Sequence, residues 1–142
     1  MMTESEAVRG ASRVAPLLIV DDDESMRMLL AKILEREGWH VACAAGGAEA
    51  IDVLRGPLPG LVVLDLLMPG TTGWDVLEFM EGRPRLSAVP VVVLTAFGEE
   101  ATAPRHRPVI HKPVEADLLV RVVRELSDEA CAQAHARASA RA

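Results

Sequence analysis

Residues Leu61–Gly73 read LVVLDLLMPGTTG, and this stretch decides the fold of the chain. Its first four residues are apolar and end at a single acid, Asp65, which is typical of a buried strand with a polar group at its carboxyl end. Pro69 has no N–H to give to a neighbouring strand and Gly70 tolerates positive φ, so we expect a turn there. The stretch predicts an acid at the mouth of an α/β sheet, where such folds place their chemistry. Taken alone, Asp65 fits a turn or cap acid equally well.

The composition bounds the class of protein. A chain of 142 residues, half of them hydrophobic, predicts one domain with its own core. Its net charge of −6 argues against a nucleic-acid-binding surface. No apolar run reaches the length of a membrane span and residues 1–16 lack the apolar centre of a signal peptide, so we expect a cytoplasmic protein. We interpret both cysteines as free thiols, and the histidines as solvated because they lack metal-ligand spacing: Cys43 and Cys131, and His40, His106, His111 and His135.

Short apolar runs alternate with amphipathic stretches from Pro16 onward, which indicates a parallel sheet covered on both faces. We expect strands at Leu17–Val20, Val41–Ala44, Leu61–Leu64, Val91–Leu94 and Val109–Ile110. We expect helices at Ser25–Glu37, Ala48–Leu54, Trp74–Met80 and Glu115–Leu126. The first helix should bury Met26, Leu29, Leu30, Ile33 and Leu34. We divide the chain into a disordered leader over 1–15, a folded domain over 16–126 and an Ala-rich helical extension or tail over 127–142.

Polar side chains follow four of the predicted strands: Asp21, Asp22, Asp65, Thr95 and Lys112. The carboxyl ends of parallel strands share one edge of a sheet, so these side chains should converge. Carboxylates within about 4–6 Å of one another repel unless a cation is present, and Mg²⁺ prefers such oxygen ligands. With the lysine ammonium and the threonine hydroxyl they describe a site for a phosphoryl group, where a carboxylate nucleophile would form an aspartyl phosphate.

Each residue also fits a purely structural role. Adjacent aspartates after a strand often cap the next helix, and we assign Asp23 to that role. A threonine after a strand is usually structural, and a Lys-Pro pair is usually a surface turn. We interpret Trp74 and Phe79 as packing residues. The joint pattern is much less probable by chance than any of its parts.

The combined motifs resemble the receiver domain of two-component response regulators. The matching residues are Leu17–Asp22, Leu64–Gly70 with Gly73, Val92–Ala96 and Lys112–Pro113, within about residues 16–126. The resemblance implies a flavodoxin-like, doubly wound α/β fold with a five-stranded parallel sheet in the order 2-1-3-4-5. The strand order comes from the resemblance and not from periodicity.

The resemblance also implies roles for individual residues. Asp65 would accept a phosphoryl group from a phosphohistidine. Asp22, Asp65 and the backbone carbonyl of Leu67 would bind Mg²⁺, and Asp21 would act mainly through water. Thr95 would hydrogen-bond the phosphoryl group and move toward it. Lys112 would pair with the acid before phosphorylation and with the phosphoryl group afterwards.

Two departures from the family pattern stand out. The family usually has a full helix between the Thr95 strand and the Lys112 strand, but here that segment contains Pro104 and Pro108. Proline inside a helix removes a hydrogen bond and clashes, so we expect this fourth helix to be short or absent. Val109 occupies the position where the family often has an aromatic partner for the threonine. We therefore expect an unusual signalling output.

Two other functions compete with phosphorylation of Asp65. A haloacid-dehalogenase-type phosphatase would use Asp21 as nucleophile in an Asp21-x-Asp23 motif, but it would leave Asp65 without a role and the chain has no room for a cap domain. A pseudo-receiver would bind partners without phosphorylation. The resemblance implies a signalling domain that modifies itself rather than a turnover enzyme.

The partners follow from the same resemblance. We expect a sensor histidine kinase or phosphotransfer protein and a downstream protein target, with no direct contact to nucleic acid or membrane. The chain resembles stand-alone receivers, and we expect a monomer or weak dimer.

Overall fold

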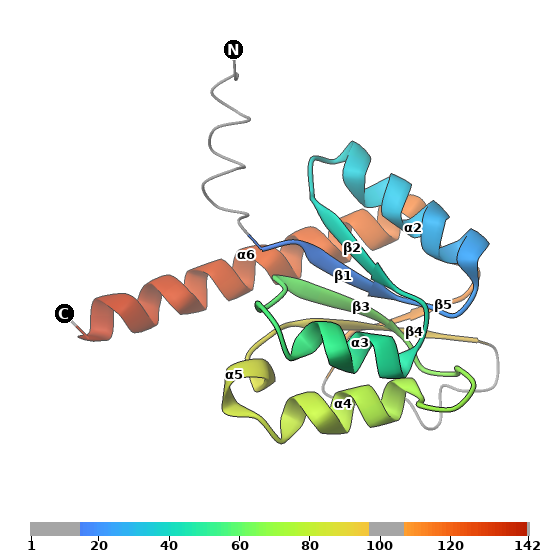
Figure 1. Ribbon diagram of the computed structural model, residues 1–142. Helices are drawn as coiled ribbons and strands as arrows, with labels where there is room; N and C mark the ends of the chain where they lie inside the picture. The colour runs from blue at the N-terminus through green and yellow to red at the C-terminus, as the bar shows by residue number, and fades with distance from the viewer. Residues whose placement is uncertain (1–14, 97–106, 142) are drawn as a thin grey trace, which may run out of the picture.

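A five-stranded parallel sheet forms the centre of the computed structural model, which describes residues 15–96 and 107–141, with side chains up to residue 133. The strands are β1 (Leu17–Val20), β2 (Val41–Ala44), β3 (Leu61–Asp65), β4 (Val91–Thr95) and β5 (Val109–His111). Their order is β2-β1-β3-β4-β5, and every neighbouring pair is parallel (Figure 1). The predicted doubly wound α/β fold and its strand order are confirmed.

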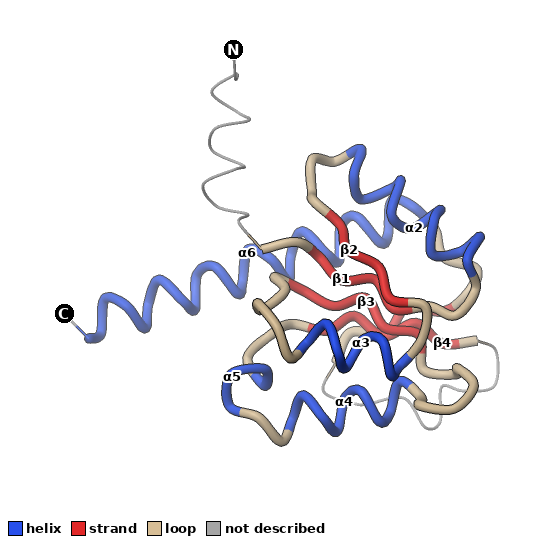
Figure 2. The backbone as a smooth tube through the Cα atoms, viewed as in Figure 1, coloured by secondary structure: helices blue, strands red, loops and turns tan. Residues whose placement is uncertain are grey.

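Helices cover both faces of the sheet. They are α2 (Glu24–Arg36), α3 (Gly47–Leu54), α4 (Gly73–Glu81), α5 (Pro84–Ser87) and α6 (Ala116–Arg141). Helices α3 and α4 cover one face, and α2 and α6 cover the other (Figure 2). Helix α5 was not predicted, because a single turn that begins at Pro84 is too short to show helical periodicity. The predicted short or absent fourth helix falls on residues 97–106, which lie outside the described part of the chain.

Helix α2 begins and ends within one residue of its predicted bounds, Ser25–Glu37. Asp23 is the N-cap, and its side chain accepts the N–H of Met26 at 3.2 Å. After the helix, Gly38 takes a positive φ of 98°, a conformation that favours glycine. Leu30 is fully buried, but Leu29, which we predicted to point inward, is 51% exposed. One residue step turns a helix by about 100°, so Leu29 lies at the rim of the apolar face.

A capping box starts α4. Asp75 donates its N–H to Thr72 Oγ1 at 3.3 Å, and Thr72 donates its N–H to Asp75 Oδ2 at 2.8 Å. The helix buries Val76 and Leu77 against the sheet. Trp74, which we predicted to be a packing residue, is 38% exposed instead.

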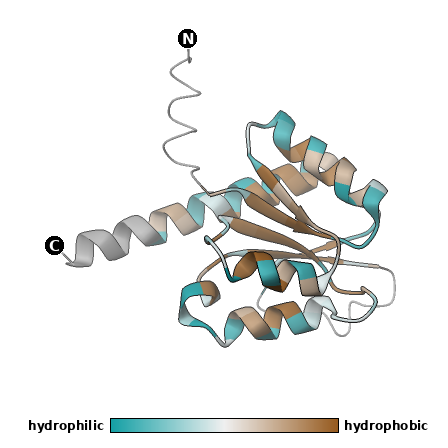
Figure 3. Cartoon of the chain, viewed as in Figure 1, coloured by the Kyte–Doolittle hydropathy of each residue, from teal (hydrophilic) through white to brown (hydrophobic). Residues whose placement is uncertain are grey.

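The core has two layers, one on each face of the sheet, and the strands between them are the most apolar part of the fold (Figure 3). Successive strand residues point to opposite faces. Val93 packs in the layer under α3 and α4, whereas Val63 and Leu94 pack in the layer under α2 and α6. By the same alternation, Thr95 belongs to the α3/α4 face and Asp65 to the α2/α6 face.

Helix α6 closes the second layer and then runs on past the sheet (Figure 1). Its first turns bury Leu119 and Val123. The helix continues through the Ala-rich segment to Arg141. The division into a leader, a folded domain and an extension stays a prediction. Among the described residues, no helix combines the length and apolar character needed to cross a membrane.

Candidate phosphoryl-transfer site

Three carboxylates meet at the carboxyl edge of the sheet. Asp21 and Asp22 follow β1, and Asp65 ends β3, the neighbouring strand. One carboxylate oxygen from each lies within 4.8 Å of the other two. Asp21 and Asp65 are buried, with 0% and 3% of their surface exposed, while Asp22 is exposed. The convergence expected from strand ends alone is therefore present.

Asp21 is held by hydrogen bonds at only one of its carboxylate oxygens. Its Oδ1 accepts the N–H of Asp23 at 2.9 Å, and its backbone carbonyl accepts a bond from Arg27 Nη1 at 2.8 Å. Its Oδ2 is buried and has no hydrogen-bond partner among the described residues. Buried polar atoms are nearly always satisfied in folded proteins. This oxygen is therefore an acceptor that a bound cation or its water ligands would satisfy.

Lys112 supplies the positive charge beside these acids. Its Nζ lies 3.4 Å from Asp65 Oδ2 and 3.7 Å from Asp21 Oδ2. Its position is fixed by the sheet, because its backbone N–H donates to the carbonyl of Thr95 at 2.8 Å. The Lys112–Pro113 peptide bond is cis. One ammonium therefore faces two buried carboxylates, and the exposed carboxylate of Asp22 lies beside them, which leaves the site net negative.

Burial dominates the electrostatics of Asp65. The pKa of the carboxyl is raised from 3.8 to about 6, mainly by burial, and the nearby charge of Asp21 acts in the same direction. The Lys112 ammonium and the N–H of Leu67, which donates to the carboxylate, act in the opposite direction. A site with this surplus of negative charge favours a cation.

The turn after β3 depends on glycine. Gly70 has a φ of 71°, in the region that favours glycine. Gly73 donates its N–H to the carbonyl of Leu66 at 2.9 Å, and a Cβ on Gly73 would lie 2.4 Å from the Asp65 carbonyl oxygen. The start of α4 can therefore pack directly on the end of β3. Leu67 lies in this turn with its side chain 68% exposed, and the predicted role of its carbonyl as a metal ligand stays a prediction.

Thr95 reaches the site from the next strand, but its side chain bonds to a residue that was not predicted to belong to the site. Thr95 Oγ1 lies 3.1 Å from Nδ1 of His111. His111 is exposed, as expected, but its Nδ1 is hydrogen-bonded to this buried hydroxyl. No local sequence signal indicated this contact, which comes from the strand register: His111 is the last residue of β5 and lies opposite Thr95 in the parallel ladder. His40 is exposed as expected, and the side chains of His106 and His135 lie outside the described residues.

The donor set fits Mg²⁺. All three acids offer oxygen, and no thiol or imidazole joins them in the described residues. Within that part of the chain, the buried Oδ2 of Asp21 has no hydrogen-bond partner. Hard oxygen ligands and one or two carboxylates are the usual environment of this ion. Asp21, Asp22 and Asp65 are thus the residues that could hold it.

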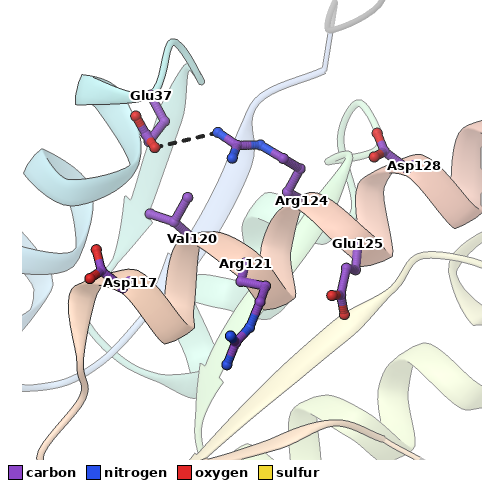
Figure 4. Close-up of a pocket in the computed structure, with 7 residues that line it drawn as sticks. All are labelled: Glu37, Asp117, Val120, Arg121, Arg124, Glu125 and Asp128. Atoms are coloured by element: carbon purple, nitrogen blue, oxygen red, sulfur yellow. Dashed lines mark hydrogen bonds and ion pairs between the residues drawn. The ribbon is translucent and has the colours of Figure 1, made fainter.

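A pocket separate from the cluster of Asp21, Asp22 and Asp65 lies along α6 and the end of α2 (Figure 4). Arg124 Nη2 lies 3.4 Å from Glu37 Oε1 there, and the Arg124 guanidinium lies 5.6 Å from the centre of the buried Trp39 ring. The rest of its lining carries charges of both signs: Asp117, Arg121, Glu125 and Asp128, with Val120 between them. None of the predicted site residues lines this pocket.

The sequence over residues 17–124 matches the model of the response regulator receiver domain family. This chain belongs to that family. It is therefore a receiver domain of two-component signal transduction, as the motifs predicted.

Two relatives and one solved structure illustrate the similarity of this receiver domain to known proteins. It is 36% identical over 85 residues to the phosphate regulon transcriptional regulatory protein PhoB of Rhizobium meliloti, covering 60% of this chain and 37% of that protein. It is 36% identical over 83 residues to sporulation initiation phosphotransferase F of Bacillus subtilis, covering 58% of this chain and 65% of that one. The receiver domain of a histidine kinase from Syntrophus aciditrophicus superposes with a TM-score of 0.75 at 28% identity, covering 81% and 91% of the two chains. The chain thus spans little more than a third of the PhoB regulator.

Proposed function

We propose that this receiver domain accepts a phosphoryl group on the carboxylate of Asp65, from a phosphohistidine on a sensor kinase or phosphotransfer protein. The observation that carries the proposal is the cluster itself: three carboxylates within 4.8 Å of one another, with the Lys112 ammonium 3.4 Å from Asp65. A relative named as a phosphotransferase supports the same reaction class. The relatives give no support to the phosphatase alternative, in which Asp21 would be the nucleophile.

Asp65 is the acid best placed to act as nucleophile. One of its carboxylate oxygens would form the new P–O bond while the P–N bond to the donor imidazole breaks and its electron pair returns to the ring nitrogen. With a pKa of about 6, roughly nine-tenths of the Asp65 side chains are deprotonated near neutral pH. The nucleophile is therefore available without a separate general base.

The other site residues neutralise charge and orient the phosphoryl group. The Lys112 ammonium would pair with a phosphoryl oxygen after transfer, and the Thr95 hydroxyl would donate a hydrogen bond to another. Mg²⁺, held by Asp22, Asp65 and the carbonyl of Leu67, with Asp21 acting through water, would offset the negative charge of the acids and the phosphoryl oxygens. Later hydrolysis would return the domain to its resting state, so the domain acts as a signalling switch rather than a turnover enzyme.

The partners of the domain belong to the same proposal. A cytoplasmic sensor kinase or phosphotransfer protein would supply the phosphoryl group, and a protein target would read the phosphorylated state or take the group onward. We propose a monomer or weak dimer that touches neither nucleic acid nor membrane directly.

Labelling with a small phosphoryl donor tests the proposal. The protein is incubated with radiolabelled acetyl phosphate and Mg²⁺, and the labelled peptide is identified after digestion. We expect label on Asp65, no label in Asp65→Asn, and normal labelling in Asp52→Asn, which makes the same change on an exposed part of α3. Label on Asp21 would instead favour the phosphatase reaction.

Binding of beryllofluoride, a phosphoryl mimic, distinguishes a phosphorylated receiver from a pseudo-receiver, the remaining alternative. We expect wild-type protein to bind it only when Mg²⁺ is present. If wild-type protein neither takes up label nor binds the mimic, the domain is a pseudo-receiver that works without phosphorylation.

A further inference from the structure

The side chains of Thr95 and His111 form a bonded pair at the edge of the site. β4 and β5 run parallel with Thr95 directly opposite His111, and Thr95 Oγ1 lies 3.1 Å from His111 Nδ1. Thr95 is fully buried, whereas His111 lies at the surface. One member of the pair is therefore fixed in the interior while the other can be changed without opening the core.

The burial of Thr95 decides which atom donates the hydrogen. A hydroxyl has one hydrogen and two acceptor lone pairs. Leaving a buried donor unpaired is rarer and costlier than leaving a lone pair unused. In the described part of the chain, the partner of Thr95 Oγ1 is the His111 ring. This assigns Thr95 as the donor and Nδ1 as the acceptor, and it places the proton of the neutral ring on Nε2.

The pair and the acids come from opposite faces of the sheet. Thr95 lies two residues after Val93 and so belongs to the same face, under α3 and α4. Asp65 lies two residues after Val63 and so belongs to the opposite face, under α2 and α6. In this structure the single hydrogen of Thr95 is directed to β5. It can serve an oxygen bound to Asp65 only after the bond to His111 has been given up.

We propose that His111 is a positioning residue that holds the Thr95 hydroxyl until a phosphoryl group on Asp65 takes over its hydrogen bond. The inference rests on the proposed function, in which Thr95 donates to a phosphoryl oxygen. Because one hydrogen cannot serve both acceptors fully, His111 weakens phosphoryl binding by the net worth of one hydrogen bond. Its position on β5 also couples occupancy of the site to the strand that precedes Lys112.

The affinity for beryllofluoride in the presence of Mg²⁺, measured by calorimetry on the full chain, tests this role. His111→Phe keeps a ring but removes the acceptor, and we expect it to bind the mimic about threefold to tenfold more tightly than wild type. His111→Asn, whose amide oxygen can accept near the position of Nδ1, should restore an affinity close to wild type. His40→Phe, the same change at an exposed histidine before β2, should leave the affinity unchanged.

A double-mutant cycle distinguishes positioning of Thr95 from a general structural effect. In a Thr95→Val background, His111→Phe should no longer change the affinity for the mimic. In the wild-type protein, the ring nitrogen NMR signals of His111 should shift when the mimic binds, and in Thr95→Val they should not.

The possible failures can be told apart. If wild-type protein does not bind the mimic at all, the proposed function fails and this inference falls with it. If wild-type protein binds but His111→Phe has the same affinity, or has the same effect with and without the Thr95 hydroxyl, only the role of His111 is refuted.

Discussion

Replacing Asp65 with asparagine should stabilise the metal-free domain at neutral pH. Only 3% of Asp65 is exposed, and burial raises its pKa from 3.8 to about 6. The folded state therefore binds a proton more tightly than the unfolded state, and stability falls as pH rises from about 4 through about 6. A shift of about two pKa units corresponds to about 3 kcal/mol, the cost of keeping Asp65 charged in the fold. Asparagine has nearly the same shape and avoids that cost.

Urea unfolding in the presence of a chelator measures the effect. At pH 8 we expect the free energy of unfolding of Asp65→Asn to exceed that of wild type by up to about 3 kcal/mol. The gap should shrink as pH falls from about 6 to 4. Asp52→Asn, an exposed acid paired with Arg55, should change stability by less than about 1 kcal/mol at either pH.

Adding Mg²⁺ provides an internal check. At about 100 times its dissociation constant the ion should stabilise wild type by about 2.7 kcal/mol, and it should do so much less for Asp65→Asn. The reasoning is refuted if the two proteins differ equally at pH 4 and pH 8, or if the asparagine variant is the less stable one at pH 8 without Mg²⁺.

Three further predictions follow from the contacts around the site. Lys112→Met should raise the pKa of Asp65 above about 6, because the ammonium now lowers it; carboxyl NMR titration measures this, and an unchanged pKa would remove Lys112 from the electrostatics of the site. Gly73→Ala should destabilise the domain by about 1–3 kcal/mol in urea unfolding, because its Cβ would lie 2.4 Å from the Asp65 carbonyl oxygen. Gly82→Ala should be tolerated, because its Cβ would lie 3.5 Å from the nearest atom, and equal effects of the two changes would contradict this. Thr72→Ala should cost about 1 kcal/mol through loss of the capping box, measured the same way, and no loss would mean that the cap does not stabilise α4.

The sheet was predictable because its signals are local. Each strand is a short apolar run bounded by a turn or a charge, and after every strand but the first glycine or proline precedes the next element. Leu17–Val20 and Val41–Ala44 match the predicted bounds, and Gly38 ends the first helix as expected. The wrong predictions also have local causes. The single turn at Pro84–Ser87 is too short to show periodicity, and three- and four-residue spacing assigned Leu29 to the buried face of α2 although it lies at the exposed edge of that face.

The site was predictable as a set of residues but not as an arrangement. Parallel strands place all their carboxyl ends on one edge, so the residues that follow the strands are enough to group Asp21, Asp65 and Lys112. Nothing local indicated that one oxygen of Asp21 would be buried without a partner among the described residues. Nothing local linked His111 to Thr95 either, because these residues are sixteen positions apart and meet only through the pairing of β4 with β5.

The amino-acid sequence by itself determined the five strands, the longer helices, their order along the chain and the acids that follow the strands, because backbone propensity and hydrophobic period act over a few residues. Tertiary structure alone decided the distances, the depth of burial of Asp65 and the partner of Thr95. Those quantities depend on the register between strands and on which helices cover each face. Both are set by packing between segments that are remote in the chain.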